Sequence, residues 1–168
     1  MTRTVFNPNN QGHITNKYPM FFGDSLGLND TVNTVNEKIA ALTELQRSFN
    51  WHPTTEVSLT QDRMDMQTSP KDIVELMTLT IGWQSMQDSI AGRSIGALLL
   101  PHVTNPECET MISEWNRMEC VHSEAYLHIV KQVMPNPDLA LLDIYKNKLQ
   151  LQRSSKIMEV FDSWFTMP

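Results

Sequence analysis

The chain is poor in cysteine, in basic residues and in long apolar runs. Its two cysteines, Cys108 and Cys120, stand on one predicted helix about 18 Å apart, too far for a disulfide, and reduced cysteines are typical of a cytoplasmic protein. No apolar run is long enough for a transmembrane helix, and the first residues lack the pattern of a signal peptide. The 13 Lys and Arg against 19 Asp and Glu give a net charge of −6, which argues against nucleic acid or an anionic membrane as a partner.

The sequence does contain a Glu-x-x-His unit, Glu119-Cys-Val-His122, inside a predicted helix over residues 105–133. Asn105 and Pro106 are typical of a helix start. Residues three apart lie on the same side of a helix, so the carboxylate and the imidazole face one place. Such units hold pairs of metal ions inside four-helix bundles. A buried Glu–His hydrogen bond, or a pair standing in water, would explain this helix alone equally well.

A second predicted helix, over about residues 70–96, carries a carboxylate on its apolar side. Ser69-Pro70-Lys-Asp72 has the residue types of a helix start. The inner positions, spaced by three and four, are Ile73, Met77, Ile81 (or Thr80), Gln84, Asp88 and Ala91. Most helical aspartates are surface charges, but a carboxylate on an apolar face is costly unless it is paired or binds a metal. We therefore expect Asp88 to converge with Glu119 and His122.

Several motifs then follow one another in a single colinear order from about residue 18 to the end of the chain. They are Pro19-Met-Phe-Phe-Gly23, Trp51-x-Pro53, Asp88-Ser-Ile-x-Gly-Arg-Ser94, Asn105-Pro-Glu-x-Glu109 and Glu119-x-x-His122-Ser-x-x-Tyr126-x-His128. In this order they resemble the small subunit of class I ribonucleotide reductase. The resemblance implies an all-α, ferritin-like helical bundle, of which residues 18–168 would be the incomplete N-terminal half with two of the four metal-ligand helices. Residues 1–17, rich in Asn and Thr, are expected to be a flexible segment.

The resemblance also implies a role for individual residues. Asp88, Glu119 and His122 would be the first-half ligands of a dinuclear centre of iron, manganese or both, with Glu119 bridging the two ions. Tyr126 would carry the tyrosyl radical, and Trp51 would start radical transfer to the large subunit. A packed Tyr and a core Trp at a helix end are the structural alternatives. The implied reaction is the reduction of ribonucleoside diphosphates for deoxyribonucleotide synthesis, in a small-subunit dimer.

The chain departs from the family because the second half of the pattern is missing. Only Glu124 and Glu159 follow His122 among the glutamates, His128 is the last histidine, and there is no second Glu-x-x-His. The family's C-terminal tail for docking on the large subunit is missing too. We expect half of a split small subunit, inactive alone and completed by a separate second-half chain. A self-assembling homodimeric di-metal bundle and a non-catalytic relative that only binds partners are the alternatives.

The split hypothesis predicts that inner helix faces stay uncovered, with an apolar patch formed by Ile73, Met77, Trp115, Met118 and Ile129. For the rest of the chain, periodicity predicts a helix over residues 30–49, a polar connection over 52–68 and a last or broken helix over 138–165. The inward side chains of the first would be Val32, Val35, Ile39, Leu42, Leu45 and Phe49. The last would make apolar contacts through Leu142, Tyr145, Leu149, Ile157, Phe161 and Trp164. No strand pattern is present.

Overall fold

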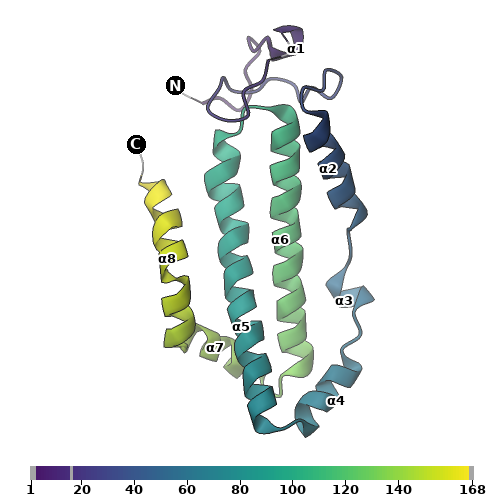
Figure 1. Cartoon of the computed structure of the whole chain (residues 1–168), viewed down its shortest axis with the longest axis vertical. Coiled ribbons are helices and arrows are strands. Elements are labelled where there is room, and N and C mark those ends of the chain that lie inside the picture. The colour runs from purple at the N-terminus through teal and green to yellow at the C-terminus, as the bar shows by residue number, and fades with distance from the viewer. Residues whose placement is uncertain (1–2, 16, 167–168) are drawn as a thin grey trace. The chain divides into compact units, whose positions relative to one another are not determined.

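The computed structural model describes residues 3–15 and 17–166, whose regular structure is helical apart from one isolated β-bridge between Phe21 and Val103 (Figure 1). The predicted all-α class is therefore confirmed. The chain divides into two compact units, Met1–Asn50 with Ser94–Arg117, and Trp51–Arg93 with Met118–Pro168. None of the described helices is long and apolar enough to cross a membrane.

The first unit contains α1 (Gly12–Thr15), α2 (Glu37–Ser48), the π-helix η1 (Ile95–Leu99), the 3-10 helix η2 (Leu100–His102) and the start of α6 (Pro106–Val133). Its core is a cluster of buried apolar side chains: Ile95, Val103, Cys108 and Ile112. Fully buried Asn105 starts α6 as predicted, because its Oδ1 accepts a hydrogen bond of 2.8 Å from the Cys108 N–H.

The second unit contains α3 (Pro53–Glu56), α4 (Thr60–Thr68), α5 (Lys71–Ser94, apart from its last residue), the rest of α6, α7 (Pro137–Lys146) and α8 (Lys148–Phe165). Here α5 and α6 lie side by side, around a core of Ile81, Val130 and Met134 (Figure 1). The amide of Gln150 at the start of α8 donates to the Leu79 carbonyl of α5 over 2.7 Å. These contacts hold α5 between α6 and α8 within this unit.

The two long helices were predicted well because strong start and stop signals bound them. The helix expected over 105–133 is α6, and the one expected over 70–96 is α5. The expected broken helix over 138–165 is the pair α7 and α8, with Asn147 between them. Its side-chain Oδ1 accepts hydrogen bonds of 3.1 Å from the N–H groups of Leu149 and Gln150, so a new helix starts there.

Other predictions were wrong. The helix expected from residue 30 begins at Glu37, since residues 30–33 form a turn in which Asp30 accepts hydrogen bonds from the N–H groups of Val32 and Asn33. The supposed polar connection over 52–68 contains α3 and α4. Several side chains predicted to face inward or to make apolar contacts are exposed, namely Val32, Leu42, Leu45, Phe49, Leu142, Tyr145, Leu149, Ile157 and Trp164.

The expected uncovered patch is only partly present. Ile73, Met77 and Trp115 are exposed and Ile129 is half-buried, but Met118 is only 5% exposed. The prediction for Met118 was wrong because residues of the chain itself already cover that side chain.

Candidate metal centre

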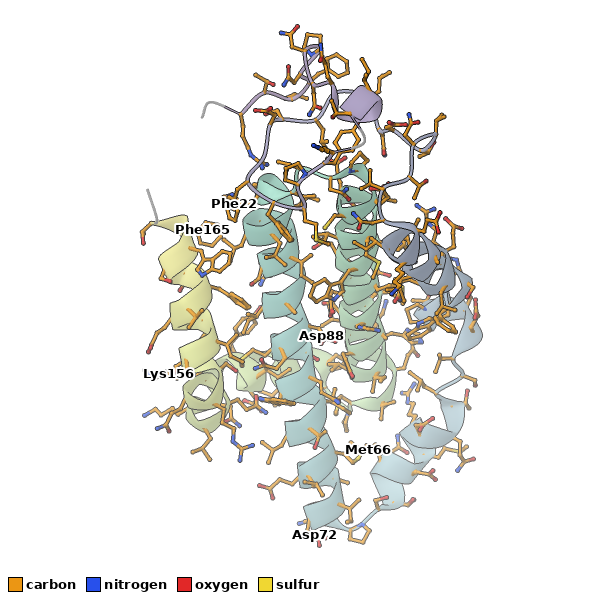
Figure 2. The ribbon with its side chains drawn as sticks, turned by 45° about the horizontal axis from the view of Figure 1, so that its top comes forward. Phe22, Met66, Asp72, Asp88, Lys156 and Phe165 are labelled. Carbon is orange, nitrogen blue, oxygen red and sulfur yellow. The ribbon has the colours of Figure 1, made fainter. Side chains whose placement is uncertain are left out.

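Two helices of the second unit bring together the three predicted ligands. Asp88 projects from α5, and Glu119 and His122 project from α6 (Asp88 is labelled in Figure 2). One ligand atom from each lies within 4.8 Å of those of the other two. Among the described residues no other group of three His, Cys, Asp or Glu side chains meets this condition. The predicted convergence is therefore confirmed, while metal binding stays a prediction.

The local geometry of each helix explains this convergence. Glu119 and His122 are one turn apart on α6, with His122 Nδ1 3.6 Å from Glu119 Oε2. On the α5 side, a Cβ added to Gly92 would stand 3.5 Å from the Glu119 Cβ. The backbone of α5 thus comes close to the Glu119 side chain, one turn beyond Asp88.

The electrostatics of the three groups favour a cation. Burial raises the pKa of the Asp88 carboxyl, and the neighbouring Glu119 charge raises it further, while His122 acts in the opposite direction. All three side chains are half-buried, so water screens the repulsion between the two carboxylates incompletely. Carboxylate oxygens with an imidazole nitrogen are donors that suit iron or manganese. The residues present fit one side of such a centre.

Tyr126 lies one turn beyond His122 on α6 and is half-buried. It packs against the core cluster of Ile81, Val130 and Met134. Burial raises the pKa of its phenol, and the Asp88 charge raises it further, so the ring lies within electrostatic reach of Asp88. The sequence predicted that Tyr126 is buried near the ligands with its hydroxyl towards them; the residue is half-buried, and its radical role stays a prediction.

Trp51 is half-buried and stands just ahead of α3. This position at a helix start agrees with a packing role as well as with radical transfer. The radical-transfer role of Trp51 stays a prediction.

The sequence reasoning missed a charged network in the first unit. Arg47 of α2 is 2.6 Å from Glu44 and 3.8 Å from Glu114 of α6. Arg117 pairs with the same Glu114 and donates to the Asn50 side-chain oxygen over 2.8 Å. The Glu–Arg spacing of three residues within each helix was the available signal.

Comparisons with known proteins agree with the motifs. The family model "Ribonucleotide reductase, small chain" matches residues 29–165. The ribonucleoside-diphosphate reductase subunit beta of Buchnera aphidicola subsp. Baizongia pistaciae is 36% identical over 162 residues, which are 96% of this chain and 42% of that protein. The chain thus spans less than half the length of this relative.

Solved structures show the same fold. A ribonucleotide reductase R2 subunit from Clostridium botulinum has a TM-score of 0.88 at 16% identity, with 100% of this chain and 52% of that chain covered. The dimanganese(II)-NrdF of Streptococcus sanguinis has a TM-score of 0.65 at 17% identity, with 83% of this chain and 49% of that chain covered. At these identities the likeness concerns the fold, and it confirms the predicted ferritin-like bundle, of which this chain holds a part.

Proposed function

The chain belongs to the small-chain family of ribonucleotide reductases, and on this premise we propose that it supplies one half of a dinuclear metal site and the radical-forming tyrosine for ribonucleoside-diphosphate reduction. The observation that carries the proposal is the meeting of Asp88, Glu119 and His122 from two helices. Tyr126, within electrostatic reach of Asp88, is the side chain to be oxidised.

Each residue of the proposed site has a separate task. Asp88 and His122 would bind one metal ion through a carboxylate oxygen and an imidazole nitrogen, and Glu119 would bridge to the second. A bound pair of iron or manganese ions would supply the oxidising power to remove one electron from a tyrosine. A tyrosine hydroxyl is protonated near neutral pH, and the raised pKa of Tyr126 favours that form further, so the phenolic proton must leave with the electron. Trp51 would pass the oxidation on towards the large subunit.

The three converging side chains offer two carboxylates and one imidazole, whereas dinuclear carboxylate centres in helical bundles take ligands from four helices. We propose that a separate second-half chain brings the remaining ligands and that the assembled small subunit works as a dimer with the large subunit. Two copies of this chain would give four carboxylates and two imidazoles, which supports a self-assembling homodimer as the second candidate. Manganese is supported by the dimanganese state of the Streptococcus sanguinis neighbour, and the donor types suit iron equally.

Copurification with a second-half chain tests the proposal. The assembled pair, loaded with Fe(II) or Mn(II) and exposed to oxygen, should bind two metal ions per site and give a tyrosyl signal in electron paramagnetic resonance. Tyr126→Phe should remove the signal and keep the metal, while the control Tyr145→Phe, at an exposed ring on α7, should change neither. A strong signal from this chain alone, lost in Tyr126→Phe, would favour the homodimer. An assembled pair without metal would favour a non-catalytic binding partner.

A further inference from the structure

A cavity of about 240 Å³ lies within the second unit, where α5, α6, α7 and α8 each contribute to its wall. Most of the wall is apolar, from Met86, Ile90, Leu127, Leu141, Ile144, Leu151 and Met158. Among the described residues that line it there is no aspartate or glutamate, and Arg93 is the one charged side chain. Arg93 belongs to the Asp88-Ser-Ile-x-Gly-Arg-Ser94 motif, in which the proposed metal chemistry uses only Asp88.

The interior of the cavity offers few polar groups to a ligand. Ser85 is 7% exposed, and its hydroxyl donates to the Ile81 carbonyl over 2.8 Å. Ser89 is half-buried, and its hydroxyl donates to the Ser85 carbonyl over 2.8 Å. Both hydroxyl protons are therefore used within α5, and the interior presents mainly apolar surface. Such a surface gains free energy when an apolar group displaces water from it.

The edge of the cavity carries a positive charge that a ligand can reach. Arg93 is exposed, and its Nη1 donates to the Ser89 carbonyl over 3.3 Å. No carboxylate oxygen of the described residues lies within 4.0 Å of its guanidinium. A guanidinium has five N–H donors, so most of them are left for a ligand. An unpaired cation beside an apolar cavity attracts an anion whose body is apolar.

The chemistry and the size of that anion follow from the wall. A guanidinium fork matches the two oxygens of a carboxylate, so a carboxylate suits Arg93. At about 30 Å³ for each water-sized atom, the cavity holds an apolar body of about eight non-hydrogen atoms. The thioethers Met86 and Met158 make favourable contacts with aromatic rings and adapt to their shape. A phenyl ring on a two-carbon linker has this size and this character.

We propose that this cavity binds a small arylalkyl carboxylate, with the ring among the apolar side chains of α5, α7 and α8 and the carboxylate on the Arg93 guanidinium. All the residues that line the site belong to the second unit, and none of them is a proposed metal ligand. The binding of this anion therefore stands or falls separately from the proposed metal chemistry.

Isothermal titration calorimetry of the 168-residue chain tests this with three probes of similar shape: 3-phenylpropanoate, the neutral 3-phenylpropanol and the cation 3-phenylpropylammonium. The carboxylate should bind about fivefold or more tightly than the alcohol, a ratio that allows for the exposure of Arg93, and the ammonium should bind most weakly. Arg93→Gln should remove the preference for the carboxylate, because it removes the charge. Arg153→Gln is the matched control and should bind like the parent chain, because Arg153 is an exposed arginine of the same unit outside this wall.

A second variant tests the cavity itself. Ser89→Leu places a larger side chain in the half-buried wall, so it should narrow the cavity and weaken the binding of all three probes without altering any charge. Circular dichroism checks that each variant keeps its helix content. The proposal is overturned if 3-phenylpropanoate does not bind, if the alcohol binds as tightly, if a folded Arg93→Gln keeps the preference for the carboxylate, or if a folded Ser89→Leu binds unchanged.

Discussion

At Asp88 the charge distribution of the second unit is unfavourable for an ionised carboxylate. Burial and the Glu119 carboxylate both raise its pKa, and the single imidazole of His122 compensates only in part. A cation among the three side chains would offset desolvation and repulsion together. Asp88 should therefore matter little for folding and greatly for metal binding.

Asp88→Asn should separate these two effects. In the metal-free chain the free energy of unfolding should change by no more than about 1 kcal/mol, because the side chain is half-buried and the substitution removes a repulsion. In the pair assembled with a second-half chain, the rise in melting temperature on adding Mn(II) should be lost. Thermal unfolding followed by circular dichroism measures both.

Asp143→Asn, at an exposed position of α7, is the matched control and should keep the Mn(II)-dependent rise. An Asp88→Asn pair that still gained stability from Mn(II) would remove Asp88 from the proposed ligands.

At the scale of elements, the packing of α5 depends on how closely neighbouring side chains approach its two glycines, Gly82 and Gly92. Buried Gly82 faces α7 and α8, and a Cβ there would stand 2.9 Å from Ile144 Cγ1 and 3.3 Å from Gln150 Nε2. Gly92, three turns later, leaves room, because the nearest atom to an added Cβ is the Glu119 Cβ at 3.5 Å. Close packing therefore requires a glycine at position 82, whereas the space around position 92 would also accept an alanine.

Gly82→Ala and Gly92→Ala should consequently change stability in opposite directions. Alanine favours a helix over glycine by about 1 kcal/mol, so Gly92→Ala should stabilise the chain by roughly 0.5–1 kcal/mol. At Gly82 the overpacking against Ile144 and Gln150 costs about 1–3 kcal/mol, which outweighs the same helix gain, so Gly82→Ala should be destabilising by up to about 2 kcal/mol. Urea unfolding of the two variants, each the control of the other, measures the difference. A stabilised Gly82→Ala would mean that α7 does not pack closely on α5.

At the scale of the whole molecule, many large apolar side chains of the second unit are exposed. On α5 these include Ile73, Leu76 and Met77, and on α8 they include Leu149, Val160 and Phe165. Where exposed apolar side chains lie together on a surface they are typical of an interface. The exposed side chains of α5 and α8 agree with the proposed second-half chain.

Met77→Asp should weaken capture of a second-half chain and leave the helix content unchanged, because the side chain is 46% exposed and a charge there remains hydrated. The charge would have to be buried only on association, which should cost about tenfold or more in affinity. Pull-down of the tagged chain with a second-half chain, together with circular dichroism, measures this. Met64→Asp on α4, at 49% exposure, is the matched control and should bind like the parent chain. Equal capture by both variants would place the interface elsewhere.

Met118 is unsuitable for this experiment, although the sequence pattern placed it on the uncovered face. At 5% exposure it is part of the folded interior, so an aspartate there would destabilise the chain itself before any partner is added. The difference between Met118 and Met77 is invisible in the periodicity, since both continue an apolar stripe.

Local signals in the sequence determined the two long helices and the side chains that α5 and α6 present to each other. Asn105 and Pro106 start α6, and the spacing of Glu119 and His122 sets both on one side of it; such effects depend only on neighbours within one or two turns. Burial depends instead on which distant element covers a side chain, and no local pattern records that. Only the tertiary structure therefore showed that Met118 is covered while Ile73 and Met77 are not. The hydrogen bonds of Glu107 depend on distant residues for the same reason. Its Oε1 accepts from the N–H of Val35, 72 residues earlier in the chain, while its buried Oε2 has no partner among the described residues.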